Sequence, residues 1–361
     1  MRRRPSFVCA GALALTLAGA SGAGPASAEP RPTPLAGNLL SPLSLAVSGD
    51  GSVWFTENYA GVLRHRGNDG RVTTPAREPG DLELSGVSEE DGTVWYVVTG
   101  RGHTVGRLHE LAPDGGDRVV ADLYAHERQT NADHDVRYGF RTLPAGCAAE
   151  VPRDGRGSYP GAAETHPVAT LRAHGATYVA DAAANTVVAV NGAGVATTVA
   201  VLPAVRTTMT RAYAEENGFP DCTIGRDYWA EPVPTDVEPG PDGSLYVTTL
   251  PGGPGELHGE PAGAVLRVLI LTGQVTRVAG GLDSPVGLAV SDDGDLYVSE
   301  LRADRISRVD PATGAATAYW RTIFPGDVET TRYGLVFSRD VLSGTAGAAD
   351  DPPLGQVIRL N

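Results

Sequence analysis

The sequence contains no lysine, only three cysteines and few aromatic residues, and each shortage narrows what the protein can be. All 29 basic side chains are arginines, set against 43 acidic ones, so the formal net charge is −14. A chain this acidic is a poor partner for nucleic acid or for an anionic membrane surface, and we expect it to bind neither. We attribute the absence of lysine to genomic base composition.

Long apolar runs are also absent, so no segment predicts a membrane-spanning helix. The N-terminus has arginines at positions 2 to 4, an apolar stretch from about Phe7 to Ala18, and small residues that end at Ala28. This pattern predicts an export signal cleaved after Ala28 and a secreted protein without membrane insertion. Removal of the three arginines would lower the formal charge from −14 to −17.

Cleavage would remove Cys9 and leave Cys147 and Cys222. Two cysteines in an exported chain favour a disulfide over a reactive thiol or a metal pair, because the compartment is oxidising. In the chain-entropy model, a loop of this length would gain at most about 4 to 5 kcal/mol of stability from the bond.

Glycine and proline are abundant, and a phrase of alternating apolar and polar residues recurs around them. The segments SPLSLAVSGDGSVWFTE (41–57) and SPVGLAVSDDGDLYVSE (284–300) each contain two short alternating runs around an Asp-Gly turn. This pattern predicts a β-hairpin. Related hairpins are predicted at 82–99, 166–181, 233–249 and 325–339. A third strand follows each of the six hairpins, and a fourth follows five of them.

Six four-stranded units, repeating at roughly 40 to 50 residues, predict an all-β fold, a six-bladed β-propeller. We expect a signal peptide at 1–28 and one propeller domain at 29–361. The predicted blades are at about 41–77, 82–123, 166–202, 233–281, 284–320 and 325–361, with insertions at 124–165 and 203–232. The last unit lacks a fourth strand, and we expect residues 32–40 to supply it, because an unpaired edge strand favours aggregation.

The longest insertions are predicted to share one face of the propeller. In this fold, the loop leaving each second strand and the loop entering the next blade lie on the same face. The insertions at 124–165, 203–232, 250–263 and 339–355 occupy such positions, and we call this side the loop-rich face. Binding sites concentrate on loops held by a rigid scaffold, so we expect function there.

The predicted disulfide would join two loops of this face, because Cys147 lies in the first insertion and Cys222 in the second. The second insertion also contains a predicted short helix from about Thr208 to Asn217. Gly218 ends it, with Pro220 beyond.

The whole mature chain resembles the ScyD/ScyE family of exported bacterial proteins. The segments that carry the resemblance are THPVATL (165–171), TYVADAAANTVVAV (177–190), ENGFPDCTIG (216–225), PVPTDVEPGPDGSLYVTTLPGGP (232–254) and RISRV (305–309). The resemblance implies a six-bladed propeller of the NHL and SMP-30 kind, but no established activity. Val168 replaces an expected aromatic residue after His-Pro, which puts a ligand contact at that position in doubt.

Polar side chains recur where second strands end on the loop-rich face. The candidate ligand or metal residues at this channel mouth are Glu57, Asn58, His166, Asp181, Asn185, Thr249 and Glu300. Carboxylate and amide oxygens suit Ca²⁺ or another divalent cation, and SMP-30-like lactonases use such an arrangement. Alternatively, each acid accepts backbone N–H bonds as a structural latch. Recurrence of an acid in three blades favours the latch.

A second group of polar residues lies in the first insertion: His126, Glu127, Asp133, His134 and Asp135. Their spacing matches no metal motif, which favours solvated loop residues. The sequence has no Gly-x-Ser-x-Gly elbow, Cys-x-x-Cys pair or phosphate-binding loop. The segment GSVWFTENYAGVLRH (51–65) resembles the blades of streptogramin lyases, but the catalytic histidines of those enzymes have no match here.

Three functions remain open. The leading one is a monomeric exported propeller that binds a small molecule or an extracellular protein on its loop-rich face, without chemistry. The second is a metal-dependent hydrolase or lactonase with Glu57, Asp181 and Glu300 near the ion. The third is a lyase acting on a cyclic natural product, which needs an essential histidine. The candidates for that histidine are His126, His134, His166 and His258.

Overall fold

The computed structural model describes residues 31–152, 157–252, 262–348 and 350–361. The predicted export signal and His258 lie outside these residues. The fold below is that of Pro32–Asn361, which forms one compact unit. Within the described ranges, every helix is too short or too polar to cross a membrane.

Five four-stranded antiparallel sheets each use four consecutive strands, as the repeat predicts. Blade 1 contains β2 (Leu45–Val47), β3 (Val53–Glu57), β4 (Val62–Arg66) and β5 (Val72–Arg77), and a short 3-10 helix, η1 (Asn58–Ala60), follows β3. Blade 2 contains β6 (Leu82–Glu90), β7 (Thr93–Gly100), β8 (Gly106–Leu111) and β9 (Asp117–Asp122). Blade 3 contains β12 (Pro167–Ala173), β13 (Ala176–Asp181), β14 (Thr186–Asn191) and β15 (Ala196–Val201).

The next two blades have the same order. Blade 4 contains β18 (Pro234–Pro239), β19 (Leu245–Thr249), β20 (Gly263–Val268) and β21 (Val275–Leu282). Blade 5 contains β22 (Pro285–Val290), β23 (Leu296–Glu300), β24 (Arg305–Val309) and β25 (Ala316–Arg321). Second strands such as β7 and β19 are buried on both faces between neighbouring blades, whereas outermost strands such as β5 and β25 are mostly exposed, and burial of the inner apolar side chains holds the sheets together.

Blade 6 joins the two ends of Pro32–Asn361. It contains β26 (Val328–Thr331), β27 (Gly334–Arg339) and β28 (Gly355–Leu360), and β1 (Pro32–Leu39) pairs antiparallel with β28. The predicted closure of the last blade by an N-terminal strand is therefore confirmed. The pairing satisfies the backbone groups along the outer edge of β28, which would otherwise be open to other chains.

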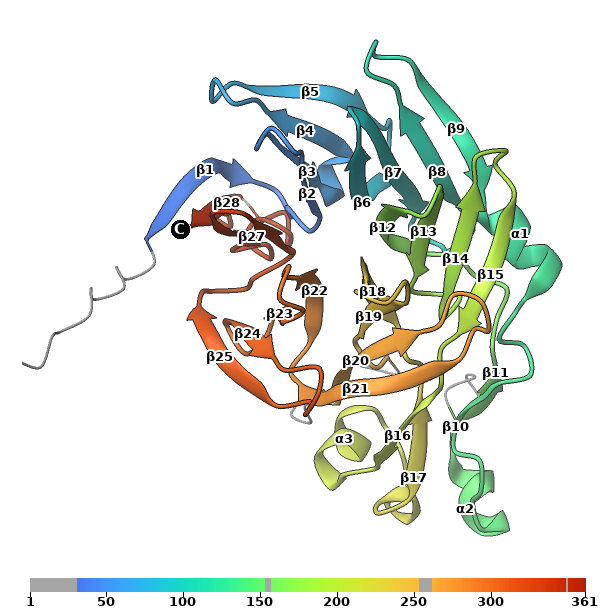
Figure 1. Ribbon diagram of the computed structural model, residues 1–361. Helices are drawn as coiled ribbons and strands as arrows, with labels where there is room; N and C mark the ends of the chain where they lie inside the picture. Colours follow the sequence, from blue (N-terminus) through green and yellow to red (C-terminus); the bar gives the residue numbers. More distant parts are fainter. Residues whose placement is uncertain (1–30, 153–156, 253–261, 349) are drawn as a thin grey trace, which may run out of the picture. The chain divides into compact units, whose positions relative to one another are not determined.

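The six blades form a ring (Figure 1). Their first strands contact one another in cyclic order, and the last contacts the first: β2, β6, β12, β18, β22, β26 and again β2. At the seam where the ring closes, Leu39, Phe55 and Val357 belong to one buried cluster. Burial of apolar surface thus closes the ring together with backbone pairing.

A seventh sheet lies outside the six blades, and the sequence did not predict it. Its order is β11-β10-β17-β16. The first insertion supplies β10 (Arg137–Gly139) and β11 (Ser158–Pro160), and the second supplies β16 (Val205–Thr208) and β17 (Asp227–Ala230). Because the two insertions flank blade 3 in the chain, their strands can pair with each other. We call this the insertion sheet.

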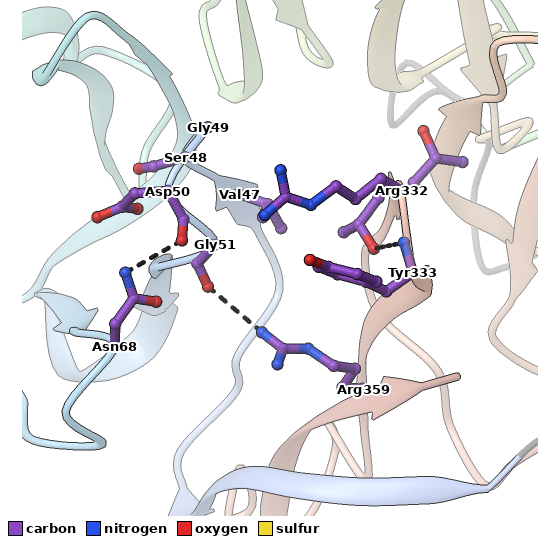
Figure 2. A pocket seen from close by; sticks show the side chains of 11 residues that line it. Val47, Ser48, Gly49, Asp50, Gly51, Asn68, Arg332, Tyr333 and Arg359 are labelled. Carbon is purple, nitrogen blue, oxygen red and sulfur yellow. Dashed lines mark hydrogen bonds between the residues drawn. The ribbon is translucent and has the colours of Figure 1, made fainter.

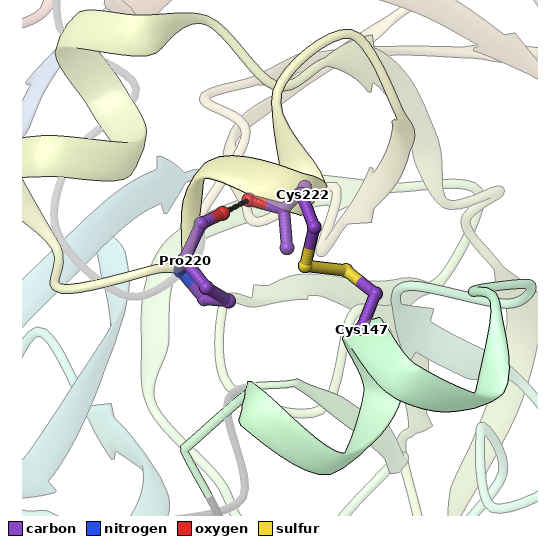
Figure 3. The surroundings of a disulfide bond; sticks show 4 residues. Cys147, Pro220 and Cys222 are labelled. Atoms are coloured by element: carbon purple, nitrogen blue, oxygen red, sulfur yellow. Dashed lines mark hydrogen bonds between the residues drawn. A yellow bond between two sulfur atoms is a disulfide. The ribbon is translucent and has the colours of Figure 1, made fainter.

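Helices and a disulfide complete the insertions. The helices are α1 (Leu123–Thr130), α2 (Ala145–Glu150) and α3 (Arg211–Glu216), with a 3-10 turn, η2, at Asp221–Thr223. The predicted helix starts later than expected, because Val205–Thr208 forms β16 and the Thr210 side chain caps α3 by accepting the Tyr213 N–H. Cys147 and Cys222 form the predicted disulfide, which joins α2 to η2 (Figure 3).

Candidate functional site

The glutamates that end the second strands of blades 1 and 5 are bonded to protein donors. Glu57 accepts the backbone N–H of Leu40 at 2.9 Å, and Glu300 accepts that of Asp283 at 2.7 Å. Each donor precedes the first strand of the same blade. An arginine of the following strand pairs with each carboxylate, at 2.6 Å for Glu57 and 2.7 Å for Glu300. These arginines are Arg64 and Arg305.

Asp181 ends the second strand of blade 3 and has the same backbone contact without an arginine. Its Oδ1 accepts the N–H of His166 at 2.7 Å, and its Oδ2 accepts the Thr165 hydroxyl. Burial raises the pKa of Asp181, against these hydrogen bonds, which lower it. Thr249, at the same place in blade 4, has a buried hydroxyl with no hydrogen-bond partner among the described residues.

These contacts are the ones that the latch interpretation requires, since each acid fastens the entry of its own blade. The described part of the chain contains no group of three His, Cys, Asp or Glu side chains arranged to hold a metal ion. Glu57, Asp181 and Glu300 lie in three separate blades, and each accepts hydrogen bonds from its own donors. A metal ion would have to displace those donors.

Two histidines and a glutamate meet on the loop-rich face between blades 2 and 3. The rings of His103 and His166 pack edge to face with centroids 5.1 Å apart. His103 Nδ1 lies 3.4 Å from Glu164 Oε2, and His166 Nδ1 lies 3.4 Å from the Thr99 hydroxyl. Burial lowers the pKa of His166 to about 4, with a further contribution from His103. His166 is therefore neutral at physiological pH and a poor general base there.

Asn58 continues this polar surface toward blade 1. Its side-chain N–H donates to Glu83 Oε2 at 3.3 Å, while its Oδ1 is buried without a described partner. Burial raises the pKa of Glu83, whereas the charges of Arg101 and His103 lower it. The adjacent Tyr59 ring is 45% exposed. This stretch thus offers hydrogen-bonding groups next to an accessible aromatic ring.

Asn185 connects blade 3 to both insertions. Its amide N–H donates to Asp133 Oδ2 at 3.1 Å, and its Oδ1 accepts the backbone N–H of Val233 at 3.2 Å. The Tyr138 hydroxyl donates to the same Asp133 oxygen at 3.0 Å. Asp133 is fully buried. Sequence reasoning selected Asn185 and Asp133 separately, and the fold brings them into contact.

Of the other polar residues of the first insertion, Glu127 lies near Asp133 and Asp181, whereas His126 and His134 have separate partners. Glu127 is buried in α1, and burial raises its pKa to about 7, with the charges of Asp181 and Asp133 adding to the shift. His126 Nε2 instead lies 2.9 Å from the Thr198 hydroxyl on β15. His134 pairs with Asp135 at 3.2 Å, and both side chains are largely exposed.

Four carboxyl groups in the centre of the ring were missed by sequence reasoning. Asp236 and Glu238 on β18, and Asp327 and Glu329 at β26, line a central cavity of about 170 Å³. Burial raises the pKa of Asp236 to about 7 and that of Glu329 to about 8. Burial and neighbouring carboxyl groups raise the pKa of Glu238 and Asp327 well above their ordinary values.

We call Asp236, Glu238, Asp327 and Glu329 the channel set. Its two aspartates also link neighbouring blades. Asp236 accepts the Leu288 N–H of blade 5 at 2.6 Å, and Asp327 accepts the Leu45 N–H of blade 1 at 2.7 Å. The signal in the sequence is Asp-Val-Glu, which occurs at 236–238 and again at 327–329. Residues two apart on a strand point to the same side, so both acids of each triplet face the channel.

No family model matches the chain. A segment of 81 residues is 38% identical to the virginiamycin B lyase of Nocardia farcinica (strain IFM 10152). This match covers 22% of the present chain and 27% of the lyase, so the chain spans about a quarter of that relative.

Solved structures of other proteins resemble the fold over most of its length. A gluconolactonase from Xanthomonas campestris superposes with a TM-score of 0.55 at 11% identity, over 92% of this chain and 90% of that one. A protein from Thermus thermophilus described as a glucose dehydrogenase gives 0.54 at 16% identity, over 92% and 100%. At these identities the likeness shows the fold alone, and the chain is an all-β propeller.

Proposed function

We propose that the protein is an exported propeller of the ScyD/ScyE type that binds a small polar molecule on its loop-rich face without converting it. One observation carries the proposal. The acids at the ends of the second strands are bonded to protein donors, whereas His166, beside Asp181, is neutral and half-buried. Such a surface is suited to holding hydrogen-bonding groups of a ligand and poorly suited to proton transfer at neutral pH.

The surface is also rigid, which favours binding. Asn185 is held by Asp133 and Glu231 of the two insertions and by Val233 at the entry to blade 4, and the disulfide between Cys147 and Cys222 fastens the insertions to each other. A group held in one orientation loses little conformational entropy when a ligand binds. The accessible Tyr59 ring and the partly exposed pair of His103 and Glu164 would border the ligand.

The test measures binding and turnover on the same compounds, gluconolactone and virginiamycin B, which the names of the similar proteins suggest. Binding by calorimetry, with product by mass spectrometry forming no faster than in a protein-free control, supports the proposal. The variant His166→Asn is expected to weaken binding, whereas His174→Asn, an exposed histidine in a turn of the opposite face, is not. Turnover of either compound would contradict the proposal.

A lyase is the second candidate, favoured by the match of 81 residues to virginiamycin B lyase and by the contact of His103 with His166. It predicts that His166→Asn or His103→Asn abolishes turnover of virginiamycin B while the folded protein keeps its melting temperature. If both variants retain wild-type turnover, a role for this histidine pair is excluded.

A further inference from the structure

A cavity of about 460 Å³ lies on the face opposite the loop-rich one, where blade 6 meets blade 1. Its walls are the turn between β2 and β3, Asn68 of the turn between β4 and β5, the turn between β26 and β27, and Arg359 of β28 (Figure 2). These turns join first strands to second strands or a third strand to a fourth, so they lie on the side with short connections. The cavity therefore lies on the other face of the propeller from the polar site around His103 and His166.

Two guanidinium groups from blade 6 face this cavity (Figure 2). Arg359 donates to the carbonyl oxygen of Gly51, across the seam, at 3.3 Å. The guanidinium carbon of Arg332 lies 4.7 Å from the centre of the Tyr333 ring. Within the described chain, neither group forms an ion pair with a carboxylate, although acids outnumber arginines in the sequence. Arginines left without such a partner in an acidic protein are available to an anion.

Asp50 is the one acid among the residues that line the cavity. Its Oδ1 accepts the backbone N–H of Ser52 at 2.9 Å, and in Figure 2 its carboxylate points away from both arginines. Arg332 also borders a second cavity, between blades 5 and 6, that contains Asp292 and Asp293. Arg359 does not line that second cavity. Of the two arginines, it is therefore the one that lines only the cavity at the seam.

The walls also offer an aromatic surface. The side chain of Tyr333 is 62% exposed, and Val47 adds apolar surface at the seam. A guanidinium group matches the two oxygens of a carboxylate, and a flat ring can lie against Tyr333. We propose that this cavity binds a small carboxylate that carries an aromatic ring.

Such a ligand would touch both blades that meet at the closure of the ring. It would contact Arg359 and Tyr333 of blade 6 together with the turn of blade 1 around Gly51. A ligand that binds only the closed ring stabilises the folded state in proportion to its occupancy. For a probe of this size we expect a dissociation constant of about 1 mM, with a rise in melting temperature as a second readout.

The experiment titrates the purified exported protein with sodium benzoate, followed by calorimetry and thermal melting. Benzamide, which has the same shape without the charge, and inorganic phosphate, which has charge without a ring, are the matched probes. We expect benzoate to bind at least about tenfold more tightly than either. Only benzoate has both a carboxylate for the arginines and a ring for Tyr333.

The variants Arg359→Gln and Arg332→Gln are expected to weaken benzoate binding by about tenfold or more. Arg71→Gln, an exposed arginine of blade 1 outside the cavity, is the matched control and should bind like the wild type. Arg332 lies in an exposed turn, so its variant keeps the test valid even if the Arg359 variant unfolds.

Four results would overturn the proposal. These are equal binding of benzamide and benzoate, binding of phosphate without benzoate, wild-type affinity in both cavity variants, and no benzoate binding at about tenfold above the expected constant.

Discussion

Two sets of carboxyl groups in the same propeller have opposite surroundings. The blade-end set, Glu57, Asp181 and Glu300, accepts N–H groups, and two of its members pair with arginine. The channel set, Asp236, Glu238, Asp327 and Glu329, lines the central cavity, where carboxyl groups face one another. Asp236 and Asp327 also accept backbone N–H groups, so what distinguishes the channel set is that other carboxyl groups lie close by and oppose its ionisation at neutral pH.

The largest expected effect is a loss of stability with rising pH, caused by the channel set. Because the pKa of Asp236 is raised to about 7 and that of Glu329 to about 8, these two groups keep protons in the folded state that they lose in the unfolded state between about pH 4 and pH 8. The contribution of the channel set to the free energy of unfolding should therefore fall as pH rises from about 5 to 8. The fall is about 4 kcal/mol for each carboxyl group that stays protonated in the folded state across this range. Urea unfolding across this range measures it.

The double variant Glu238→Gln and Glu329→Gln removes two of the four charges and should flatten this pH dependence. At pH 8 the variant is expected to be more stable than the wild type, and at pH 5 nearly equal to it. A wild-type protein whose stability rises steadily from pH 5 to 8 would contradict this account of the channel.

The next effect is the loss of the Glu300 contacts. Glu300→Ala leaves the Asp283 N–H and the partly buried Arg305 without their acceptor, so we expect about 3 kcal/mol of destabilisation. Glu110→Ala removes an exposed pair with Arg118 and should cost less than about 1 kcal/mol. Both values come from chemical unfolding at pH 7. Equal costs would show that the blade-end acid has no special role.

The smallest effect is expected for Asp181, which has donors but no arginine. Asp181→Asn keeps one acceptor for the His166 N–H and removes a buried charge, so the two changes oppose each other. We expect a change of about 1 kcal/mol or less at pH 8. Thermal melting at pH 8 tests this. A loss of stability as large as that of Glu300→Ala would show that the latch depends on the negative charge of the acid.

The blades could be predicted from the sequence because their signal is local and repeated. Each hairpin alternates apolar and polar residues around a glycine turn, as in 41–57 and 284–300, and apolar burial then fixes the register. The closure by β1 followed from counting strands, since one blade lacked a fourth.

The insertion sheet could not be predicted in the same way. Its strands β10, β11 and β17 have three or four residues each, too few for a period to be recognised. They pair across two separate insertions, so their partners are distant in the sequence. The Asp-Val-Glu triplets were visible, but only the fold shows that their carboxyl groups line the same central cavity.

The pairing of β1 with β28 has a consequence for how the protein matures. The outermost strand of the last blade, β1, is synthesised before the other strands of the ring. Its partner, β28, is synthesised after all of them. Until then the ring is an open arc with two unprotected ends, and folding limited by so distant a contact is slow. The ring can therefore close only after β28 has been synthesised.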